Sequence, residues 1–517
     1  MHAVSTDYDV IVIGAGHNAL VSAAYLAQAG RRVVVFERRS MVGGAVGTTE
    51  TIPGYRFDVG GSAHILIRTT PIVEELGLDQ FGLDYIDLDP MFSGVRLDEE
   101  PVHFYRDAER TAHEFESRFP SQGEAYHRFH ERWLPFGQLV RELFMSVPGP
   151  FSLGRKLLFD RSFGRDWRDA LATILRPYGD ALPSDLTESR ITTPMLWMAA
   201  QSGPPPLEPM SAPFLLWHPM YHVGGAARPR GGSGMLTVAL AEHITAHGGE
   251  IHTGAAVDEI VVRDGRAAGV RVGRDIYTAR AVLSGAHAHE TFHRLLPEEL
   301  VPGRLRRSRI GNGFGAMLRV ALRRPVQYAE PIGPVVRNGL QLVCRDVDQI
   351  NSAYGDYLAG RPSVDPPLVA MTFSEVDPTL APDGHEVLFL WGQYYPYELS
   401  GGRSWDDIAD DVEDSMLDTF ERFAPGTRDN IVGTLFQHPV WLERELGLLR
   451  GNVMHLEMSL DQMFLMRPSL GSGLYRGPVN DLFLTGASTH PGGGIMGASG
   501  RNAATVVLKS LDRRRFW

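Results

Sequence analysis

The stretch DYDVIVIGAGHNALVSAAYLAQAGRRVVVFERR, from Asp7 to Arg39, decides the fold. Its apolar run from Asp9 to Ile13 ends at a glycine and predicts a short buried strand. Residues Gly14 to Ala19 then follow the spacing G-x-G-x-x-A. Ala23 and Gly30 are small at places where a helix packs closely on a sheet. The stretch therefore predicts a strand, a glycine turn and a helix in that order.

A second strand and an acid complete the signature of a dinucleotide site. Arg32 to Phe36 predicts the strand, and Glu37 lies at its end, 21 residues after Gly16. Gly14 permits the tight turn, Gly16 lets the backbone approach a pyrophosphate, and Glu37 accepts from ribose hydroxyls. A glycine turn in an unrelated α/β domain is the alternative. The order of all five features favours dinucleotide binding.

The following segment distinguishes FAD from NAD. SMVGGAVGTTETIPGYRFDVGGSAH, from Ser40 to His64, does not continue into another βα unit. Two glycine pairs, Gly43-Gly44 and Gly60-Gly61, bracket a short excursion, as expected where backbone passes close to a bulky ligand. This arrangement resembles the FAD-containing amine oxidase and phytoene desaturase superfamily, in which a strand ending in an acid precedes an xxGG loop. FAD is therefore the predicted cofactor.

The resemblance implies where FAD is held. Glu37 is expected at the adenosine ribose, the Gly43-Gly44 loop at the diphosphate, and backbone groups of Val257 at the adenine. The C-terminal stretch GASTHPGGGIMGASGRNAA, from Gly486 to Ala504, is expected to wall the flavin and to start a helix near Ile495. The predicted cofactor-binding residues are Gly14, Gly16, His17, Asn18, Ala19, Glu37, Arg38, Gly43, Gly44, Gly60, Gly61, Ser62, Ala63, Val257, Gly486, Ala487, Gly494, Ile495 and Met496.

These clusters lie far apart in the sequence, so the predicted fold is α/β with a discontinuous Rossmann-type FAD-binding domain and an inserted α+β substrate domain. The FAD-binding domain is expected at residues 1–75, 225–300 and 476–517. The substrate domain is expected at residues 76–224 and 301–475.

Composition limits the classes of partner. The 517 residues carry a formal net charge of −12, which argues against nucleic acid. The single cysteine, Cys344, fits a reducing cytoplasm. The N-terminus does not resemble a secretory signal, and no apolar run reaches the length of a membrane span. A cytoplasmic protein, soluble or peripherally attached to the cytoplasmic membrane, is expected.

Three stretches resemble a narrower group. VGGSAHILIRTTPIVEELGL (Val59–Leu78), the segment from Thr193 to Gly225 that contains WMAAQSGPPP, and the segment from Arg450 to Ala504 that contains STHPGGGIMGASGRN resemble the CrtO-type β-carotene 4-ketolases. This resemblance implies hydride transfer to flavin and oxidation of the ring C4 methylene of a carotene to a ketone, with water as the hypothesised oxygen source. Carotenoid desaturases and isomerases are the alternative, an amine oxidase is less favoured, and a lipid carrier like the Rab GDP-dissociation inhibitors is a further reading.

Several polar residues are candidates for handling protons or facing the substrate. His64, Tyr221 and His222 are candidates to take a proton, and His490 to face the substrate; for each, a packing or hydrogen-bonding role is the competing interpretation. Histidine pairs with box-like spacing raise the idea of a metal site, but Pro219 is expected to break any helix that aligns His218 with His222. No metal is predicted.

A carotenoid substrate implies a bilayer. Trp133 to Phe159 shows Trp133, Phe136 and Phe144 at helical spacing, followed by Arg155 and Lys156. A membrane-docking surface near residues 133–160 and a core helix pair are both compatible with this pattern. The electron acceptor is expected to be a quinone or dioxygen.

Overall fold

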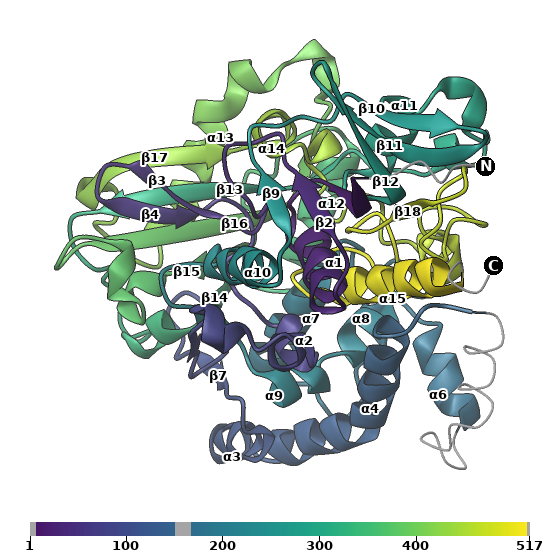
Figure 1. Ribbon diagram of the computed structural model, residues 1–517. Coiled ribbons are helices and arrows are strands. Elements are labelled where there is room, and N and C mark those ends of the chain that lie inside the picture. The colour runs from purple at the N-terminus through teal and green to yellow at the C-terminus, as the bar shows by residue number, and fades with distance from the viewer. Residues whose placement is uncertain (1–6, 150–166, 514–517) are drawn as a thin grey trace.

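Two large sheets organise the chain. The computed structural model describes residues 7–149 and 167–513. Each large sheet has seven strands, and two small two-stranded sheets accompany them (Figure 1). The small sheets are β3 (Thr48–Ile52) with β4 (Tyr55–Asp58), and β5 (Tyr85–Asp87) with β8 (Ala227–Pro229).

The first sheet contains the two strands predicted from the opening stretch. Its order is β10-β11-β12-β1-β2-β9, and β18 pairs with β12. Val10 lies opposite Val33, and Ile13 opposite Phe36, in the parallel pair of β1 and β2. The strands are β1 (Tyr8–Ile13), β2 (Val33–Phe36), β9 (Glu250–His252), β10 (Glu259–Arg263), β11 (Arg266–Val272), β12 (Asp275–Ser284) and β18 (Leu482–Leu484). Segments from three distant parts of the sequence thus share one sheet.

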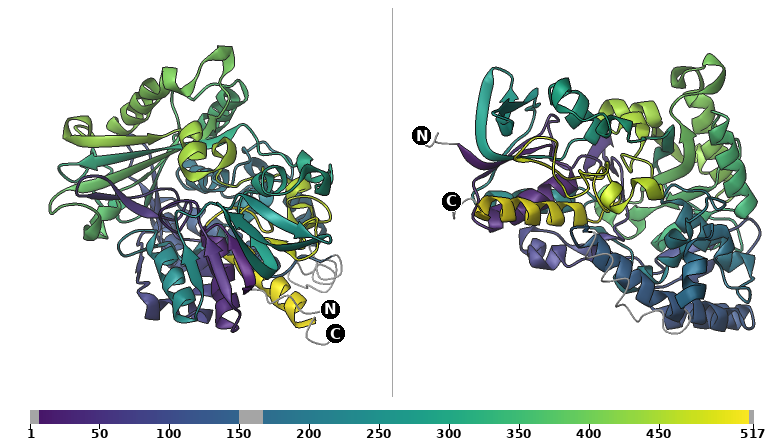
Figure 2. Two further views of the ribbon diagram at one scale, coloured as in Figure 1. Left: turned by 45° about the horizontal axis from the view of Figure 1, so that its top comes forward. Right: turned by 90° about the vertical axis from the view of Figure 1, so that its right-hand side faces the viewer.

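Three helices pack beside this sheet: α1 (His17–Gln28), α10 (Met235–Ala246) and α15 (Ala498–Arg513). Helix α1 contacts both of the others, and Figure 2 shows α15 alongside it. A Cβ on Gly500 would lie 2.3 Å from the carbonyl oxygen of Asn18, so the two helices cross in direct contact. Helix α15 begins at Ala498 rather than near Ile495, because Gly494 and Gly497 have positive φ angles that interrupt a helix.

The second sheet is covered on both faces. Its order is β17-β13-β16-β15-β14-β6-β7. Alternate residues of β13 pack on α13 at one face, and Met317 joins the larger core on the opposite face. The strands are β6 (Phe92–Val95), β7 (Val102–Phe104), β13 (Gly313–Leu322), β14 (Leu340–Val343), β15 (Leu368–Met371), β16 (Glu386–Pro396) and β17 (Ile431–Gln437). Burial of every residue of β13 and β16 follows from this double cover.

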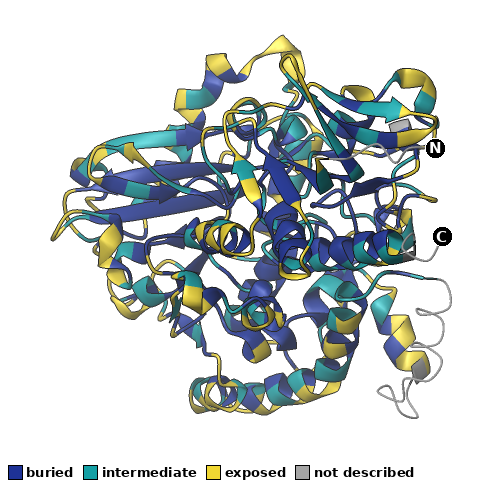
Figure 3. Ribbon diagram, in the orientation of Figure 1, coloured by how far each residue is buried: buried dark blue, intermediate teal, exposed yellow. Residues whose placement is uncertain are grey.

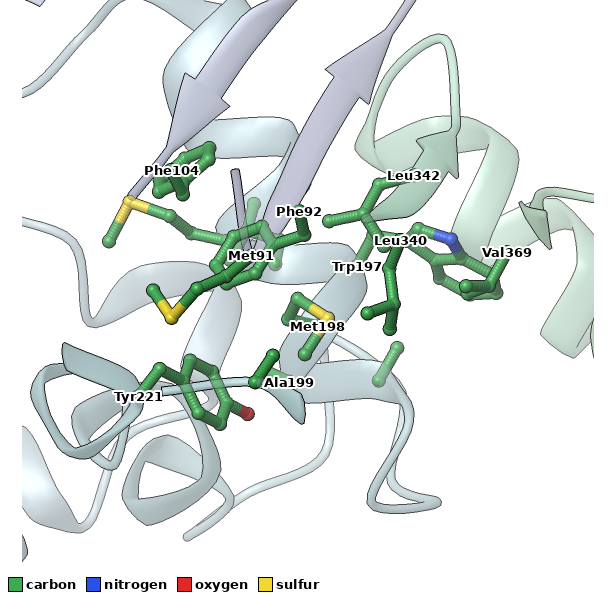
Figure 4. Packing of buried hydrophobic residues seen from close by; sticks show 14 of the residues in the cluster. Met91, Phe92, Phe104, Trp197, Met198, Ala199, Tyr221, Leu340, Leu342 and Val369 are labelled. Carbon is green, nitrogen blue, oxygen red and sulfur yellow. The ribbon is translucent and has the colours of Figure 1, made fainter. Parts of the chain in front are cut away.

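Helices surround the second sheet. Figure 3 shows buried strands and outer helices with alternating buried and exposed residues. The helices not yet named are α2 (Ile72–Glu75), α3 (Ala108–Arg118), α4 (Gln122–Phe144), α6 (Trp167–Ile174), α7 (Ser189–Ala200), α8 (Ala212–Leu216), α9 (Pro219–Gly224), α11 (Ala288–His293), α12 (Val347–Leu358), α13 (Trp405–Glu421) and α14 (Pro439–Leu446). Figure 4 shows Trp197 of α7 packed near Leu340 and Val369 of the sheet.

The predicted membrane-docking surface on α4 is wrong for the described residues. Trp133 and Phe136 are buried, and Phe144 is half-buried. Their helical spacing serves the protein core, and buried rings cannot enter a bilayer. The remainder of that surface, residues 150–160 with Arg155 and Lys156, lies outside the described residues. Across residues 7–149 and 167–513, no helix combines the length and apolar character needed to cross a membrane.

A buried arginine connects the second sheet to the glycine-rich segment around Gly60. Nη2 of Arg319, on β13, donates to the carbonyl of Gly60 at 2.9 Å, and its Nε donates to Gln437 Oε1 at 3.0 Å. Gln437 in turn donates to the carbonyl of Val59 at 3.1 Å. Burial lowers the pKa of Arg319 to about 9, so the guanidinium stays charged at neutral pH. The second sheet thereby fixes the position of residues 59–60.

Candidate functional site

The carboxylate of Glu37 ties the glycine turn to the end of β2. Its Oε2 accepts the backbone N–H of Ala15 at 2.7 Å, and its Oε1 accepts that of Arg39 at 2.9 Å. Glu37 is buried. Each carboxylate oxygen keeps a further lone pair, so the group can still accept from ribose hydroxyls.

Open space lies in front of the N-terminus of α1. Gly14 adopts a φ of +86°, and a Cβ placed on Gly16 would meet no atom within 4 Å. Helix α1 has no side-chain cap among the described residues and no acid in its first turn, so its first N–H groups are free for an anion. The Oδ1 atom of Asn18 is buried without a partner in the described chain. These features fit the diphosphate of FAD.

The Gly43-Gly44 loop packs directly on this turn. The N–H of Gly43 donates to the carbonyl of Ala15 at 2.8 Å, and a Cβ on Gly44 would lie 3.2 Å from Cα of Gly16. Arg38 extends away from the turn, since a Cβ on Gly447 would lie 2.2 Å from its Nη2. Arg39, which the sequence reasoning missed, donates to the carbonyl of Gly44 at 3.0 Å.

Two glycine-rich segments meet at one cavity. Its volume is about 1670 Å³, and His17 lines it near the glycine turn. The predicted residues on its wall are Gly60, Gly61, Ser62, Ala63, Gly494, Ile495 and Met496. A Cβ on Gly61 would lie 2.8 Å from Cδ1 of Ile495, so the two segments are in contact. The structure thus brings together predicted residues that are over 400 positions apart in the sequence.

The glycines of the C-terminal turn are required by protein neighbours as well as by space for a ligand. A Cβ would lie 2.9 Å from Sδ of Met458 at Gly492, and 2.6 Å from Cδ1 of Leu66 at Gly494. At Gly493 it would lie 2.3 Å from Sδ of Met454. The expectation that a side chain here would clash with the flavin therefore needs a correction, because the first clash is with the protein itself.

Three predicted residues lie outside this cavity wall. Gly486 has a φ of +94° and donates its N–H to Ser499 Oγ at 3.0 Å, directly after β18. The carbonyl of Ala487 accepts from Nε of Arg467 at 2.9 Å. Val257 is buried, and its carbonyl accepts from Nη1 of Arg294 at 3.3 Å.

The rest of the cavity is apolar and extends toward the second sheet. The wall includes Tyr221, one of the residues proposed for proton transfer, and burial raises its pKa above the ordinary value. The other wall residues include Phe136, Leu139, Val140, Phe144, Met198, Trp217, Phe314, Met317, Leu340, Val369, Met371, Phe389 and Trp391. Met198 and Tyr221 lie close together in Figure 4. Such walls suit a ligand that is itself largely hydrocarbon.

His64 is held inside the protein rather than on the cavity wall. Its Nδ1 and Nε2 form hydrogen bonds with Tyr85 Oη and Ser233 Oγ, each at 2.8 Å. Burial lowers the pKa of His64 to about 3, with the positive charge of Arg228 as a further cause. Both ring nitrogens are occupied, so His64 positions neighbouring segments in this structure.

His222 belongs to a buried hydrogen-bonded chain with His218. The hydroxyl of Tyr126 lies 3.0 Å from Nε2 of His218 and 2.5 Å from Nε2 of His222. The expected separation of the two histidines by Pro219 is wrong, because Pro219 is the first residue of α9 and begins that helix. Nδ1 of His222 donates to the carbonyl of Arg106 at 3.2 Å, so Nε2 accepts from Tyr126.

His490 braces the C-terminal turn from behind. Its Nε2 donates to the carbonyl of Leu143 at 3.0 Å, and burial lowers its pKa to about 4. The ring is buried against Phe144 and Phe464, whereas the next residue, Pro491, lines the cavity. His490 therefore joins the end of α4 to the turn.

The segment from Met454 to Arg467 also shapes the site, and the sequence reasoning missed it. Arg467 is fully buried, and its five N–H groups all meet backbone carbonyl oxygens, those of Met454, Leu456, Glu457, Gln462 and Ala487. Burial lowers its pKa to about 9, so it stays charged at neutral pH. The sequence carries no local signal for this role, since every partner of Arg467 is main chain.

The described residues contain no group of three or more histidine, cysteine or acidic side chains placed to hold a metal ion. The spaced histidines instead find hydrogen-bond partners or stack in pairs, as His287 does on His455.

Comparisons with known proteins agree with an FAD site. The profile of a family described as flavin containing amine oxidoreductase matches residues 20–508. A rat protein named pyridine nucleotide-disulfide oxidoreductase domain-containing protein 2 is 33% identical, covering 98% of this chain and 94% of its own length. Cys344 is the only cysteine here, so a disulfide within this chain is impossible.

Two bacterial relatives act on isoprenoids by name. One of the limonene dehydrogenase polypeptides of Castellaniella defragrans is 27% identical, covering 98% of this chain and 96% of its own. The lycopene-forming phytoene desaturase of Pseudescherichia vulneris is 26% identical, covering 97% and 99%. Among solved structures, an oxidoreductase from Methanosarcina mazei superposes with a TM-score of 0.61 at 18% identity, covering 97% of this chain and 100% of its own.

Proposed function

The chain belongs to the flavin containing amine oxidoreductase family and is an FAD-dependent oxidoreductase, and we propose that it dehydrogenates a long isoprenoid hydrocarbon of the carotenoid type. The observation that carries this proposal is the apolar cavity of about 1670 Å³ that reaches the 493–496 turn. Pockets for one small ligand usually measure roughly 300–1,000 Å³. The cavity therefore has room for a large substrate beside part of the cofactor.

The charge distribution of the walls favours a hydrocarbon over an amine. Among the described residues, Glu208 and Asp461 are the only carboxylates on the cavity wall, and both are exposed. An ammonium group inside the cavity would lose its hydration without gaining an anion, which costs several kcal/mol. A neutral polyene carries no such penalty. The names of the limonene and phytoene relatives support the same choice.

The proposed reaction removes a hydride and a proton from neighbouring carbon atoms and leaves a new double bond. Bound FAD supplies a two-electron acceptor for the hydride. The apolar walls exclude water and hold the chain of the substrate. Tyr221 stays neutral because its pKa is raised, so its hydroxyl can orient a ligand but is not a phenolate base at neutral pH.

Ketone formation at a ring methylene is the second candidate. It requires one water molecule and two successive hydride removals, and hence two rounds of reoxidation by a quinone or dioxygen. Gln201 and Ser202, from the segment that resembles the 4-ketolases, place polar groups on an otherwise apolar wall. Those groups favour this candidate because they can hold a water molecule, which dehydrogenation does not need.

We further propose that the enzyme takes its substrate from a bilayer through an exposed apolar patch. A hydrocarbon of about 40 carbons would cost roughly 30 kcal/mol to hydrate at about 0.8 kcal/mol per CH₂. Binding free energies rarely exceed about 20 kcal/mol, so capture from water is not a working route. Leu171, Leu175, Leu207 and Met210 are 47%, 46%, 64% and 41% exposed, and we call these four residues the mouth patch.

The mouth patch is continuous with the cavity. Leu171 and Met210 both line the cavity while remaining exposed, so the cavity reaches the surface at this point. Met210 donates its N–H to the carbonyl of Leu175 at 3.1 Å, which joins the end of α6 to the loop before α8. A hydrocarbon that leaves a bilayer here enters the cavity without crossing water.

The experiment that tests the function uses the FAD-loaded protein with liposomes that contain phytoene, lycopene or β-carotene. Anaerobic loss of the oxidised flavin absorbance reports hydride transfer, and mass spectrometry reports the product. Loss of two hydrogens supports dehydrogenation. Gain of one oxygen with loss of two hydrogens supports the ketone, and ¹⁸O-labelled water must then label it after correction for exchange. Flavin reduction by amines alone would contradict both candidates.

A further inference from the structure

His455 has an unusual backbone conformation beside the flavin turn. Its φ is +64°, in the left-handed region, where residues other than glycine are uncommon and often mark functional sites. Its neighbours Met454 and Met458 line the cavity and contact the turn at Gly493 and Gly492. The His455 side chain therefore starts from a fixed point behind that turn.

Hydrogen bonds determine which ring nitrogen of His455 carries the proton. Ser488 Oγ accepts the N–H of Ala288 at 3.0 Å and lies 2.9 Å from Nδ1 of His455. With that N–H on one lone pair, the hydroxyl is placed to donate to Nδ1. The neutral imidazole then carries its proton on Nε2.

His287 holds the same residue from a second direction. Its Nδ1 accepts the N–H of His289 at 3.1 Å, so its Nε2 carries the proton and donates to the carbonyl of His455 at 2.9 Å. The two imidazole rings stack, with their centroids 4.8 Å apart and an angle of 29° between their planes. The orientation of the His455 ring is thus fixed by a stack and two hydrogen bonds.

The free edge of the His455 ring has no role within the described chain. His455 is half-buried, and its Nε2 has no hydrogen-bond partner among residues 7–149 and 167–513, yet it is not shut off from solvent. His17, which lines the cavity at the start of α1, is close enough to contribute to the lowered pKa of His455, after burial, His287 and Arg467. The accessible N–H thus lies between the glycine turn and the C-terminal turn.

We propose that His455 is a cofactor-binding residue whose Nε2–H donates to an oxygen of the ribityl–diphosphate chain of FAD. The proposal rests on FAD binding and not on the identity of the substrate. A purely structural anchor needs only the bonds at Nδ1 and at the carbonyl, and it leaves Nε2–H unused. A donor fixed in one tautomer and orientation loses little entropy when a phosphate or ribityl oxygen arrives.

Two substitutions separate the donor from the fold. His455→Gln keeps an N–H₂ group near the position of Nε2, and His455→Leu removes it. Both new side chains are unbranched at Cβ, so the strain at positive φ is matched. Apoprotein is titrated with FAD, and quenching of flavin fluorescence gives the Kd. We expect the Kd to rise at least tenfold in His455→Leu and less than threefold in His455→Gln, with equal apoprotein melting temperatures.

A control and a second variant keep the test decisive. His293→Leu changes an exposed histidine on α11 and should leave the Kd unchanged. Should His455→Leu fail to fold, Ser488→Ala removes the hydroxyl that selects the tautomer, and we expect a rise in Kd of about two- to fivefold. Equal Kd values for His455→Leu and His455→Gln, or an unchanged Kd in a folded Ser488→Ala, would overturn the assignment.

Discussion

A Cβ on Gly493 would lie 2.3 Å from Sδ of Met454 and 2.8 Å from its Cα. Gly493→Ala therefore forces the C-terminal turn away from residues 454–458. We expect weaker FAD binding, by about tenfold or more, and a lower melting temperature. Met454→Ala in the same chain removes the sulfur but not the backbone, so it should restore part of both losses. A double-mutant cycle on Kd and melting temperature measures this coupling, and strictly additive effects would contradict it.

The two hydrogen bonds accepted by Glu37 lead to a second prediction. Both carboxylate oxygens face backbone N–H groups, so Glu37→Gln points an amide donor at one of them. A buried unpaired donor costs about 1–3 kcal/mol. We expect Glu37→Gln to lower the unfolding free energy by that amount and to weaken the binding of FAD more than that of flavin mononucleotide, which lacks the adenosine. Calorimetric titration with both cofactors is the measurement, and equal losses would contradict a role at the adenosine ribose.

The buried histidines predict a loss of stability in acid. Burial lowers the pKa of His64 to about 3 and that of His222 to about 4, so both remain neutral in the folded protein. The unfolded chain takes up a proton at each as the pH falls below about 6.5. Stability is therefore full above pH 6.5 and declines toward pH 4, by up to about 1.4 kcal/mol per pH unit for each group.

Denaturant titration from about pH 7.5 to about pH 4.5 checks this dependence. His222→Gln removes one titrating group while keeping a hydrogen-bond acceptor for Tyr126, so its slope of unfolding free energy against pH should be shallower. His113→Gln alters an exposed histidine of α3 and serves as the matched control. A wild-type slope of zero, or equal slopes in His222→Gln and wild type, would be inconsistent with neutral buried histidines.

Local spacing made the FAD-binding fold predictable. The turn from Gly14 to Ala19 and the acid at Glu37 are close in sequence, and the family match confirms the fold and the cofactor predicted from them. Contacts between distant segments carry no such local signal. Tyr126 meets His222 from 96 positions away, and Arg467 binds only main-chain carbonyls. Neither partner can be recognised from residue type or spacing.

The mistaken docking surface has a related cause. Trp133 and Phe136 recur at helical spacing, and a helix that faces the core has the same period as one that faces a bilayer. Only the structure shows which side of α4 is covered. The mouth patch escaped notice because Leu171, Leu207 and Met210 come from two segments without a shared period.

Membrane attachment is expected to depend on the mouth patch. Leu171→Gln, Leu175→Gln and Met210→Gln together remove three exposed apolar side chains, so flotation with liposomes should fall at least fivefold while FAD content is retained. The matched control is Leu358→Gln with Val364→Gln, which are 67% and 87% exposed but do not line the cavity. Equal flotation of both variants would place the contact elsewhere.

Gln201 and Ser202 separate the two candidate reactions. Gln201→Leu with Ser202→Ala removes the polar groups of the α7–α8 connection from the wall and leaves the apolar surface intact. If water is held there, the variant should still reduce its flavin with a hydrocarbon substrate but should form at least tenfold less ketone, because the intermediate then loses a proton instead of gaining water. The measurement is the ratio of dehydrogenated to oxygenated product by mass spectrometry. A ratio unchanged from wild type would show that water reaches the substrate by another route, and the second candidate would lose the observation that favours it.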